Sequence, residues 1–381
     1  MYTISDYILW RGDIPFSEAP FNAVDGYILA KAGTPDFTGL IEEGEEELFL
    51  CDLIDRYTRA RGEEGNTLGA LTSHGIMPML RSLSVTKRFG SVRAKRFVKI
   101  IDAGETEQFS ALTLLLPDGT AYVTFRGTDD TLLAWKENMY LASEHIVAAQ
   151  RDACEYLEEI AGTLEGPIRV GGHSKGGNLS VFAASKVSEE IQDRIIEVFS
   201  FDGPGFRSAF LDDPGYARIL PKVRAIQPEH SLVGTLLYRK EKPEYVECTK
   251  AGVPAHDGLC WSALPDGFEP APALQPFSEI YMRAMRRTLI PMSAEQRRAF
   301  ADALFEILTA SGAETVSDLT AQGLKIKAGM VYSLIQDSET RNFVSEFLEN
   351  MITEVTRLGG AAEPKGIRGV IIDGVNRVIR K

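Results

Sequence analysis

The amino-acid sequence predicts an α/β fold: a mostly parallel sheet with an antiparallel edge, covered by helices on both faces. Short apolar runs typical of strands alternate with amphipathic segments from about residue 96 to residue 226. Pro117-Asp118-Gly119 is a strong turn signal that joins two of these runs directly, which favours an antiparallel pair. The composition agrees, since 44% hydrophobic and 25% charged residues are ordinary proportions for a globular protein.

Three regions of the chain differ in pattern. Residues 1–90 look mainly helical and irregular, and we expect their apolar clusters to pack on the main core. Residues 91–275 contain the strands and should form the α/β core. Residues 276–381 read as a helical region that packs on this core or forms a surface for a protein partner. Within it, Ser293-Ala294-Glu295-Gln296 matches a capping box at the start of a helix.

The predicted strands of the core have β-branched or aromatic apolar residues and lie between turn signals. In chain order they cover residues 96–101, 110–116, 121–125, the run from 168, 195–201 and 222–226. An amphipathic helix with apolar residues at helical spacing from Ile146 to Ile160 precedes the run at Ile168, and a helix rich in small residues follows it.

The run from Ile168 leads into Gly172-His173-Ser174-Lys175-Gly176, which is a G-x-S-x-G pattern between a strand and a helix. A serine on such a sharp turn has a strained backbone and an exposed hydroxyl above the sheet. The glycines two residues before and after it are needed because side chains there would collide. We therefore predict that Ser174 is a nucleophile rather than part of a structural turn.

An activated serine needs a histidine base, which in this fold follows the serine in the chain. His256 lies in a polar, glycine-rich loop after the last strand region, and we prefer it to His230, which directly follows a strand. The orienting acid has three candidates. Asp202 and Glu229 each follow a strand at its carboxyl end, whereas Asp257 adjoins His256, and neighbouring residues rarely orient each other correctly. We favour Asp202, with Glu229 as the alternative.

An oxyanion hole should combine two N–H groups near the nucleophile. The first candidate is the N–H of Lys175, which also gains from the start of the helix. The second is Thr128, where Phe125-Arg126-Gly127-Thr128 leaves its strand. An ordinary polar strand end, with Arg126 in a salt bridge, is an equally good interpretation of that loop.

Two motifs together resemble the fungal-type (class 3) lipases. Residues Tyr122–Thr128 are similar to the strand and oxyanion segment of that family, and residues 172–177 to its Gly-His-Ser-Leu-Gly-Gly elbow. The interval between them is expected to contain one helix. The resemblance covers roughly residues 94–260, and it extends to an uncharacterised bacterial group of lipase-like proteins.

The resemblance implies an α/β-hydrolase fold, serine-ester chemistry, and neither a metal nor a cofactor. It also implies that Thr128 offers both its N–H and its hydroxyl to the oxyanion. The segment Asp129–Asn138 falls where those lipases have a mobile lid, so that Leu132, Leu133 and Trp135 are lid candidates.

The sequence departs from the family pattern at two points. Lys175 replaces the usual apolar residue after the serine and would put a charge near the elbow. The family's acid follows the next strand, where this sequence has Ser231, so that the acid would have moved to Asp202.

The formal net charge of −13 argues against a nucleic-acid partner and against electrostatic adsorption to anionic membranes. We expect no secretory signal and no transmembrane segment, and hence a cytoplasmic protein. The four cysteines have no metal-site or disulfide spacing and are expected to be reduced thiols.

These observations predict a serine hydrolase that acts on small-molecule or lipid carboxylic esters, as esterases and lipases do, through Ser174, His256 and Asp202. A thioesterase or peptidase could use the same residues. The alternative is a non-catalytic α/β-hydrolase-like module whose C-terminal helices bind a protein partner.

Overall fold

The structure is a computed structural model that describes residues 1–41, 47–61, 75–129, 131–289 and 291–309, and six further positions: Asn342, Glu346, Glu349, Asn350, Thr353 and Arg357. Most of the predicted C-terminal region therefore lies outside the described residues. None of the described helices has the length and apolar character of a membrane span.

An eight-stranded sheet forms the centre of the described chain, and its strands lie side by side in chain order. They are β1 (Leu48–Phe49), β2 (Arg93–Asp102), β3 (Glu107–Leu115), β4 (Ala121–Phe125), β5 (Ile168–His173), β6 (Ile195–Phe201), β7 (Val223–Pro228) and β8 (Glu244–Val246). Strands β1 to β4 pair antiparallel, and β4 to β8 pair parallel. This confirms the predicted mostly parallel sheet with an antiparallel edge.

The strand order determines on which face of the sheet the connecting helices lie. The connections contain α5 (Leu132–Tyr140), α6 (Ala148–Ala161), α7 (Lys175–Lys186), α8 (Glu189–Arg194) and α9 (Pro214–Ile219). Because each connection steps one strand in the same direction, right-handed crossovers bring their helices to one face of the sheet. On that face α6 and α7 pack against each other, and α7 packs against β4, β5 and β6.

The other face of the sheet is covered by the N-terminal helices, α1 (Ile4–Arg11), α2 (Ala23–Ala32), α3 (Leu50–Arg61) and α4 (Ile76–Leu83). Here α2 contacts β4, β5 and β6, the strands that α7 covers from the opposite side. Side chains of one strand alternate accordingly: Tyr122 packs with the N-terminal helices, whereas Val123 packs with α6 and α7. Helices therefore cover both faces, as predicted.

One buried arginine holds the N-terminal segment together. Arg88 is fully buried, and its Nε and Nη2 donate to the two carboxylate oxygens of Asp25 at 2.7 and 2.6 Å. Its other N–H groups donate to the carbonyl oxygens of Ile14, Ala19 and Pro20 at 3.0 to 3.1 Å. All five donors of the guanidinium are thus used, which satisfies the requirement for burying this charge.

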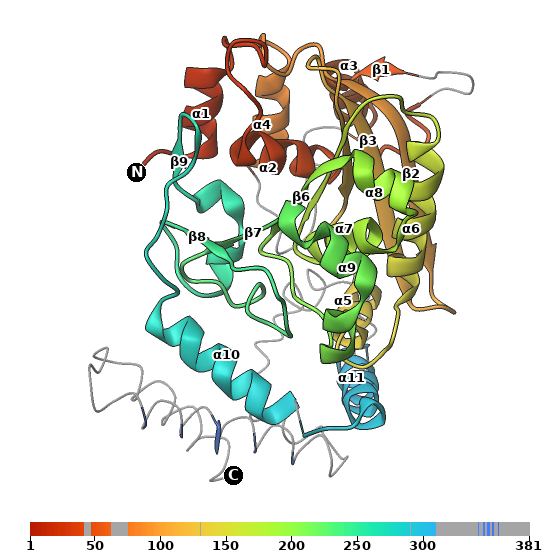
Figure 1. Cartoon of the computed structure of the whole chain (residues 1–381), viewed down its shortest axis with the longest axis vertical. Helices are drawn as coiled ribbons and strands as arrows, with labels where there is room; N and C mark the ends of the chain where they lie inside the picture. The colour runs from red at the N-terminus through yellow and green to blue at the C-terminus, as the bar shows by residue number, and fades with distance from the viewer. Residues whose placement is uncertain are drawn as a thin grey trace.

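Two helices follow the sheet. They are α10 (Pro276–Leu289) and α11 (Ala294–Thr309), and they lie at the end of the molecule opposite α1 and α4 (Figure 1). The predicted capping box is present, because Ser293 N donates to Gln296 Oε1 at 2.8 Å and Gln296 N donates to Ser293 Oγ at 3.2 Å. A small two-stranded sheet, β9 (Ala263–Leu264) with β10 (Gly267–Phe268), precedes α10.

The interval between the two lipase-like motifs differs from expectation. It contains two helices, α5 and α6, and not one. Ile146, placed at helical spacing, precedes α6 and is exposed. The first of the two helices was missed because its apolar residues do not form a clear stripe, whereas α6 buries a regular one.

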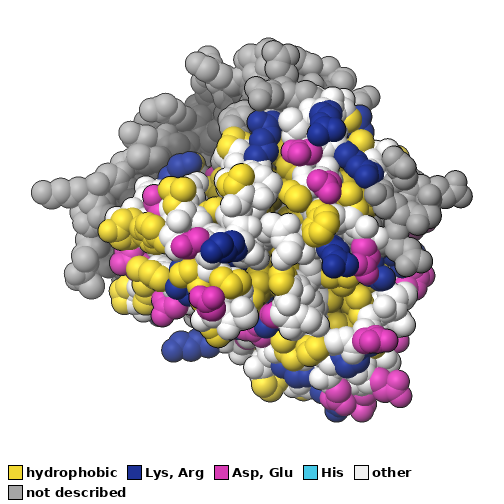
Figure 2. All heavy atoms as spheres, turned by 90° about the horizontal axis from the view of Figure 1, so that it is seen from above, with side chains coloured by type: hydrophobic (Ala, Val, Ile, Leu, Met, Phe, Trp, Pro, Cys, Tyr) yellow, Lys and Arg dark blue, Asp and Glu magenta, His cyan; other side chains and the backbone are white. Residues whose placement is uncertain are grey.

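The surface at the α1 and α4 end is of mixed character. Figure 2 shows this end from above, with acidic, basic and apolar side chains interspersed over its described part. Such mixing is ordinary for a soluble protein surface.

Replacing Arg88 by methionine should lower the free energy of unfolding by about 3–5 kcal/mol, because Asp25 would stay buried without its cation. Arg93→Met is the matched control: the Arg93–Glu47 pair is exposed, and its loss should cost about 0–1 kcal/mol. Chemical denaturation followed by circular dichroism measures both. Equal costs for the two variants would contradict the role assigned to Arg88.

Candidate active site

The turn between β5 and α7 places Ser174 in a strained conformation, with φ 60° and ψ −129°. A non-glycine residue rarely adopts a positive φ, and such strain is concentrated at functional sites. A side chain at Gly172 would lie 2.6 Å from the carbonyl oxygen of Phe125, and one at Gly176 would overlap the same carbonyl. These glycines therefore allow β4, β5 and α7 to meet beneath the serine.

His256 and Asp202 are in direct contact. His256 Nδ1 lies 2.6 Å from Asp202 Oδ2, and the Asp202 side chain is fully buried. The other carboxylate oxygen accepts a hydrogen bond from Ser231 Oγ and another from Gly234 N at 3.0 Å. A buried, fully hydrogen-bonded carboxylate of this kind fixes the orientation and the tautomer of the histidine ring.

The two alternative residues lie elsewhere. The carboxylate of Glu229, at the end of β7, accepts a hydrogen bond from Gln275. His230 does not line the cavity that contains Ser174, whereas His256 does. The structure therefore brings together Ser174, His256 and Asp202 of the predicted residues, and Ser231 occupies the position next to Asp202.

The segment that carries His256 is held from several sides. Trp261 Nε1 donates to the carbonyl of Ala255 at 2.8 Å, and Tyr27 Oη of α2 accepts from Gly258 N at 2.9 Å. Cys248 and Cys260, on either side of the segment, have their thiols 2.9 Å apart. All four cysteines are free, but this pair is in contact, which their spacing in the sequence did not predict.

His173, next to the serine, points toward the same segment. Its Nε2 lies 2.6 Å from the carbonyl oxygen of His256, and its Nδ1 lies 2.9 Å from Lys31 Nζ. Burial, together with the nearby Lys31, lowers the pKa of His173 well below its usual range. Burial also lowers the pKa of Lys31 to about 8. Sequence reasoning missed both residues, because Lys31 lies 142 positions from His173 and outside every motif.

The two oxyanion candidates lie on the same cavity as Ser174. The N–H of Lys175 is at the start of α7, where no earlier helical turn can accept it. Thr128 Oγ1 accepts a hydrogen bond from Asn138 Nδ2, which leaves the hydroxyl proton of Thr128 available to another acceptor. Arg126 also lines the cavity. It forms no ion pair among the described residues, although the alternative interpretation of this loop expected Arg126 in a salt bridge.

The ammonium group of Lys175 points away from the serine and is paired with an acid. Its Nζ is 2.6 Å from the carboxylate of Glu137 in α5, and both side chains are fully buried. Glu137 also accepts from the N–H groups of Gln108 and Ala149, each at 3.1 Å. The expected charge near the elbow is therefore part of a closed, buried network that joins α5 to α7.

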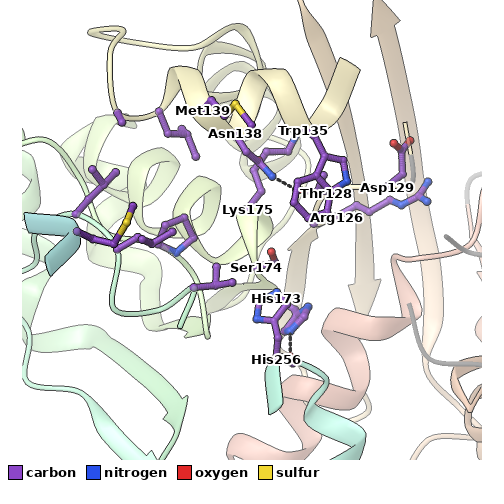
Figure 3. Close-up of a pocket in the computed structure, with 18 of the residues that line it drawn as sticks. Arg126, Thr128, Asp129, Trp135, Asn138, Met139, His173, Ser174, Lys175 and His256 are labelled. Atoms are coloured by element: carbon purple, nitrogen blue, oxygen red, sulfur yellow. Dashed lines mark hydrogen bonds between the residues drawn. The ribbon is translucent and has the colours of Figure 1, made fainter. Parts of the chain in front are cut away.

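A cavity of about 510 Å³ opens above Ser174. Figure 3 shows Ser174 beside His173 and His256, with Trp135, Asn138 and Met139 reaching in from α5. Large apolar side chains also line it: Leu141, Val233, Leu236, Leu237, Met285 and Leu289. The described His, Cys, Asp and Glu side chains nowhere form a group of three or more that could hold a metal ion.

Of the lid candidates, only Trp135 lines the cavity; Leu132 is buried and Leu133 does not reach it. Helix α5 is fixed on two sides, because Glu137 pairs with Lys175 and Lys136 pairs with Asp302 of α11 at 2.9 Å. Movement of α5 away from Ser174 would have to break the buried pair. A mobile lid in this segment therefore stays a prediction.

The chain is similar to known proteins both in sequence and in structure. Residues 83–306, more than half of the chain, match the sequence model of a family described as Mbeg1-like. The chain belongs to the Mbeg1-like family. Lys31 and Tyr27 lie before the part of this Mbeg1-like chain that the family model matches.

One similar solved structure is described as the crystal structure of M37 lipase. It is 14% identical, the alignment covers 62% of this chain and 70% of that chain, and the TM-score is 0.35. No curated protein matches the Mbeg1-like chain. The mostly parallel sheet with helices on both faces agrees with the α/β-hydrolase fold that the two motifs implied.

Breaking the buried pair between α5 and α7 should be costly, whereas removing both charges should not. Glu137→Gln alone leaves the Lys175 ammonium buried and unpaired, which should cost about 3–5 kcal/mol of unfolding free energy. The double variant Glu137→Gln/Lys175→Met should recover part of this loss, and a double-mutant cycle in urea measures the coupling.

The control for this cycle is the exposed Arg283–Glu279 pair of α10, where Glu279→Gln should cost about 0.3–0.5 kcal/mol. Additive effects of Glu137→Gln and Lys175→Met would contradict a direct interaction between the two charges.

Proposed function

We propose that this protein is a serine hydrolase that cleaves carboxylic esters through an acyl-enzyme. Ser174 Oγ attacks the ester carbonyl while His256 Nε2 accepts its proton, and the C–O bond to the alcohol breaks as His256 returns the proton to the leaving oxygen. Water then attacks the acyl-enzyme by the same route in reverse, releasing the acid and restoring Ser174. Asp202 orients His256.

The contact between His256 Nδ1 and the buried carboxylate of Asp202 is the observation that carries this proposal. With Nδ1 engaged by the carboxylate, Nε2 of a neutral ring is left as the proton acceptor. The strained turn at Ser174, on the same cavity, supports a nucleophile. If His256 only stabilised a loop, no strained serine would be needed beside it.

Lys175 N–H and Thr128 are proposed to stabilise the oxyanion. The start of α7 adds the favourable field of a helix N-terminus to the Lys175 N–H. The Thr128 side chain is oriented by Asn138 of α5, so that its hydroxyl proton can be directed at the developing charge.

The largely apolar lining supports an acyl chain as the group that fills most of the cavity, because apolar walls gain from burying such a chain. An ester of a small molecule or of a lipid fits this lining. A thioester would be attacked by the same groups, and comparing oxygen esters with thioesters of one acyl chain separates these substrates.

Intact-mass measurement after incubation with a fluorophosphonate tests the nucleophile. The wild type should gain one adduct, and Ser174→Ala should gain none because the attacking oxygen is absent. His256→Ala should react far more slowly. A folded wild type that stays unlabelled, with and without detergent micelles, would favour the non-catalytic alternative.

The acid is tested by Asp202→Asn, which should lower kcat for ester hydrolysis by about 10³–10⁴-fold because the His256 tautomer is no longer fixed. Glu229→Gln is the matched control at the end of the neighbouring strand, and it should stay within about threefold of wild type. The reverse order of the two effects would assign the acid to Glu229.

Ester chain length tests the cavity. If the acyl chain lies against the apolar walls, kcat/KM should rise by up to about fourfold per added methylene until the cavity is filled, since each buried methylene contributes about 0.8 kcal/mol. Ala142→Phe, which narrows the cavity, should move the optimum to shorter chains. A kcat/KM independent of chain length would contradict this assignment.

A further inference from the structure

The N-terminal segment contributes a charged side chain to the site. Lys31 lies in the last turn of α2, is 7% exposed and lines the cavity that contains Ser174. Its Nζ lies 2.9 Å from His173 Nδ1, and no carboxylate of a described residue lies within ion-pair distance of it. A nearly buried ammonium directed at an imidazole nitrogen, and not at an acid, is unusual for a merely structural lysine.

This contact determines the protonation of the His173 ring. An ammonium can only donate hydrogen bonds, so Nδ1 of His173 must accept and carry no proton. The other nitrogen, Nε2, faces the carbonyl oxygen of His256 at 2.6 Å, and a carbonyl oxygen can only accept. His173 is therefore neutral, with its proton on Nε2.

The same ring supports the main chain of His256. The hydrogen bond from His173 Nε2 ends on the His256 carbonyl oxygen, and the two imidazole rings lie close together, with centroids 4.4 Å apart and planes at 35° (Figure 3). His256 is thus held at its side chain by Asp202 and at its main chain by His173.

Helix α2 forms one platform for this arrangement. Tyr27, one turn before Lys31, accepts a hydrogen bond from Gly258 N and packs against Trp261 and His173. Two side chains at i and i+4 of one helix therefore meet the His256 segment, Tyr27 directly and Lys31 through His173.

We infer that Lys31 is a positioning residue for His256, acting through the ring of His173. It keeps His173 neutral with its proton on Nε2, and that proton holds the His256 carbonyl so that the ring of His256 faces Ser174. The inference rests on the proposed function in so far as His256 is the base, but the protonation state of His173 can be measured without any turnover.

The charged and titratable groups around His173 come from several elements. Lys31 and Tyr27 face it from α2, and His256 belongs to the supported segment. Asp257 and Arg126, which follows β4, act electrostatically on Lys31. Among these groups, only Lys31 bonds to Nδ1 of His173. Without Lys31, Nδ1 is no longer required to accept a hydrogen bond, while the other groups stay in place.

Nitrogen-15 histidine NMR of the full chain provides the first readout, since the protein has only five histidines and His173→Gln assigns the signal. In the wild type, His173 should be neutral with a proton on Nε2 below about pH 8, where Lys31 is an ammonium, and should take up a second proton only well below the usual range of a histidine. In Lys31→Met, the ring should take up its second proton at a higher pH than in the wild type. Lys31→Arg, which keeps a cationic donor, should restore the wild-type behaviour.

Kinetics provide the second readout. Lys31→Met should lower kcat for ester hydrolysis by about 10–100-fold with KM changed less than threefold, because a displacement of the base by about 1 Å affects the chemical step. Lys31→Arg should recover most of this loss. Lys250→Met, which removes an exposed lysine from the chain just before His256, is the control and should retain wild-type kcat.

Tyr27→Phe distinguishes structural support of the His256 segment from the positioning of His256 through His173. It removes the bond to Gly258 and should lower stability, yet leave His173 neutral with its proton on Nε2. If Lys31→Met does not fold, Lys31→Leu, which also lacks a donor, replaces it in both measurements.

A His173 ring that titrates identically in wild type and Lys31→Met would overturn the inference. An unchanged kcat in Lys31→Met, together with a changed protonation of His173, would also overturn it, because Lys31 would then not position His256. If the wild type neither hydrolyses esters nor reacts with fluorophosphonate, the proposed function fails. The NMR comparison alone then decides whether Lys31 sets the state of His173.

Discussion

The close meeting of three backbones beneath Ser174 is the constraint on which the rest of the site depends. The end of β4 touches the first turn of α7 at Gly176, and β5 passes both at Gly172. This contact gives Ser174 its positive φ and sets where the ends of β6 and β7 must lie, because all these strands are parallel and end at one edge. Asp202 and the His256 segment are arranged around that edge.

The strand order explains why the N-terminal helices are needed to cover one face of the sheet. Strands that follow one another in chain order place all their crossover helices on one face, which leaves the other face of β4, β5 and β6 apolar and uncovered. The N-terminal helices bury it, and Arg88 fixes them by binding Asp25 and three carbonyl groups. Helix α2 thereby comes to lie beneath the His256 segment, where Tyr27 and Lys31 contact it or its neighbour.

Local signals in the sequence were sufficient for the parts of the fold that depend on neighbours in the chain. The strand Ala121–Phe125, the serine turn and the capping box at Ser293 are encoded within a few residues each. The short strands β1 and β8 have too few residues for a pattern. The Lys31–His173 contact and the Lys175–Glu137 pair could not be predicted, because each joins segments that only the sheet topology brings together.

The geometry of neighbouring parallel strands also explains why the proposed acid, Asp202, lies beside the position that Ser231 occupies. Asp202 follows β6 and Ser231 follows β7, and Ser231 Oγ donates to Asp202 Oδ1, so that both positions reach the same point beside His256. Carboxylates at both positions would repel each other in a buried place. With Asp202 present, a hydroxyl at Ser231 is the better neighbour, since it adds a hydrogen bond to the carboxylate and no charge.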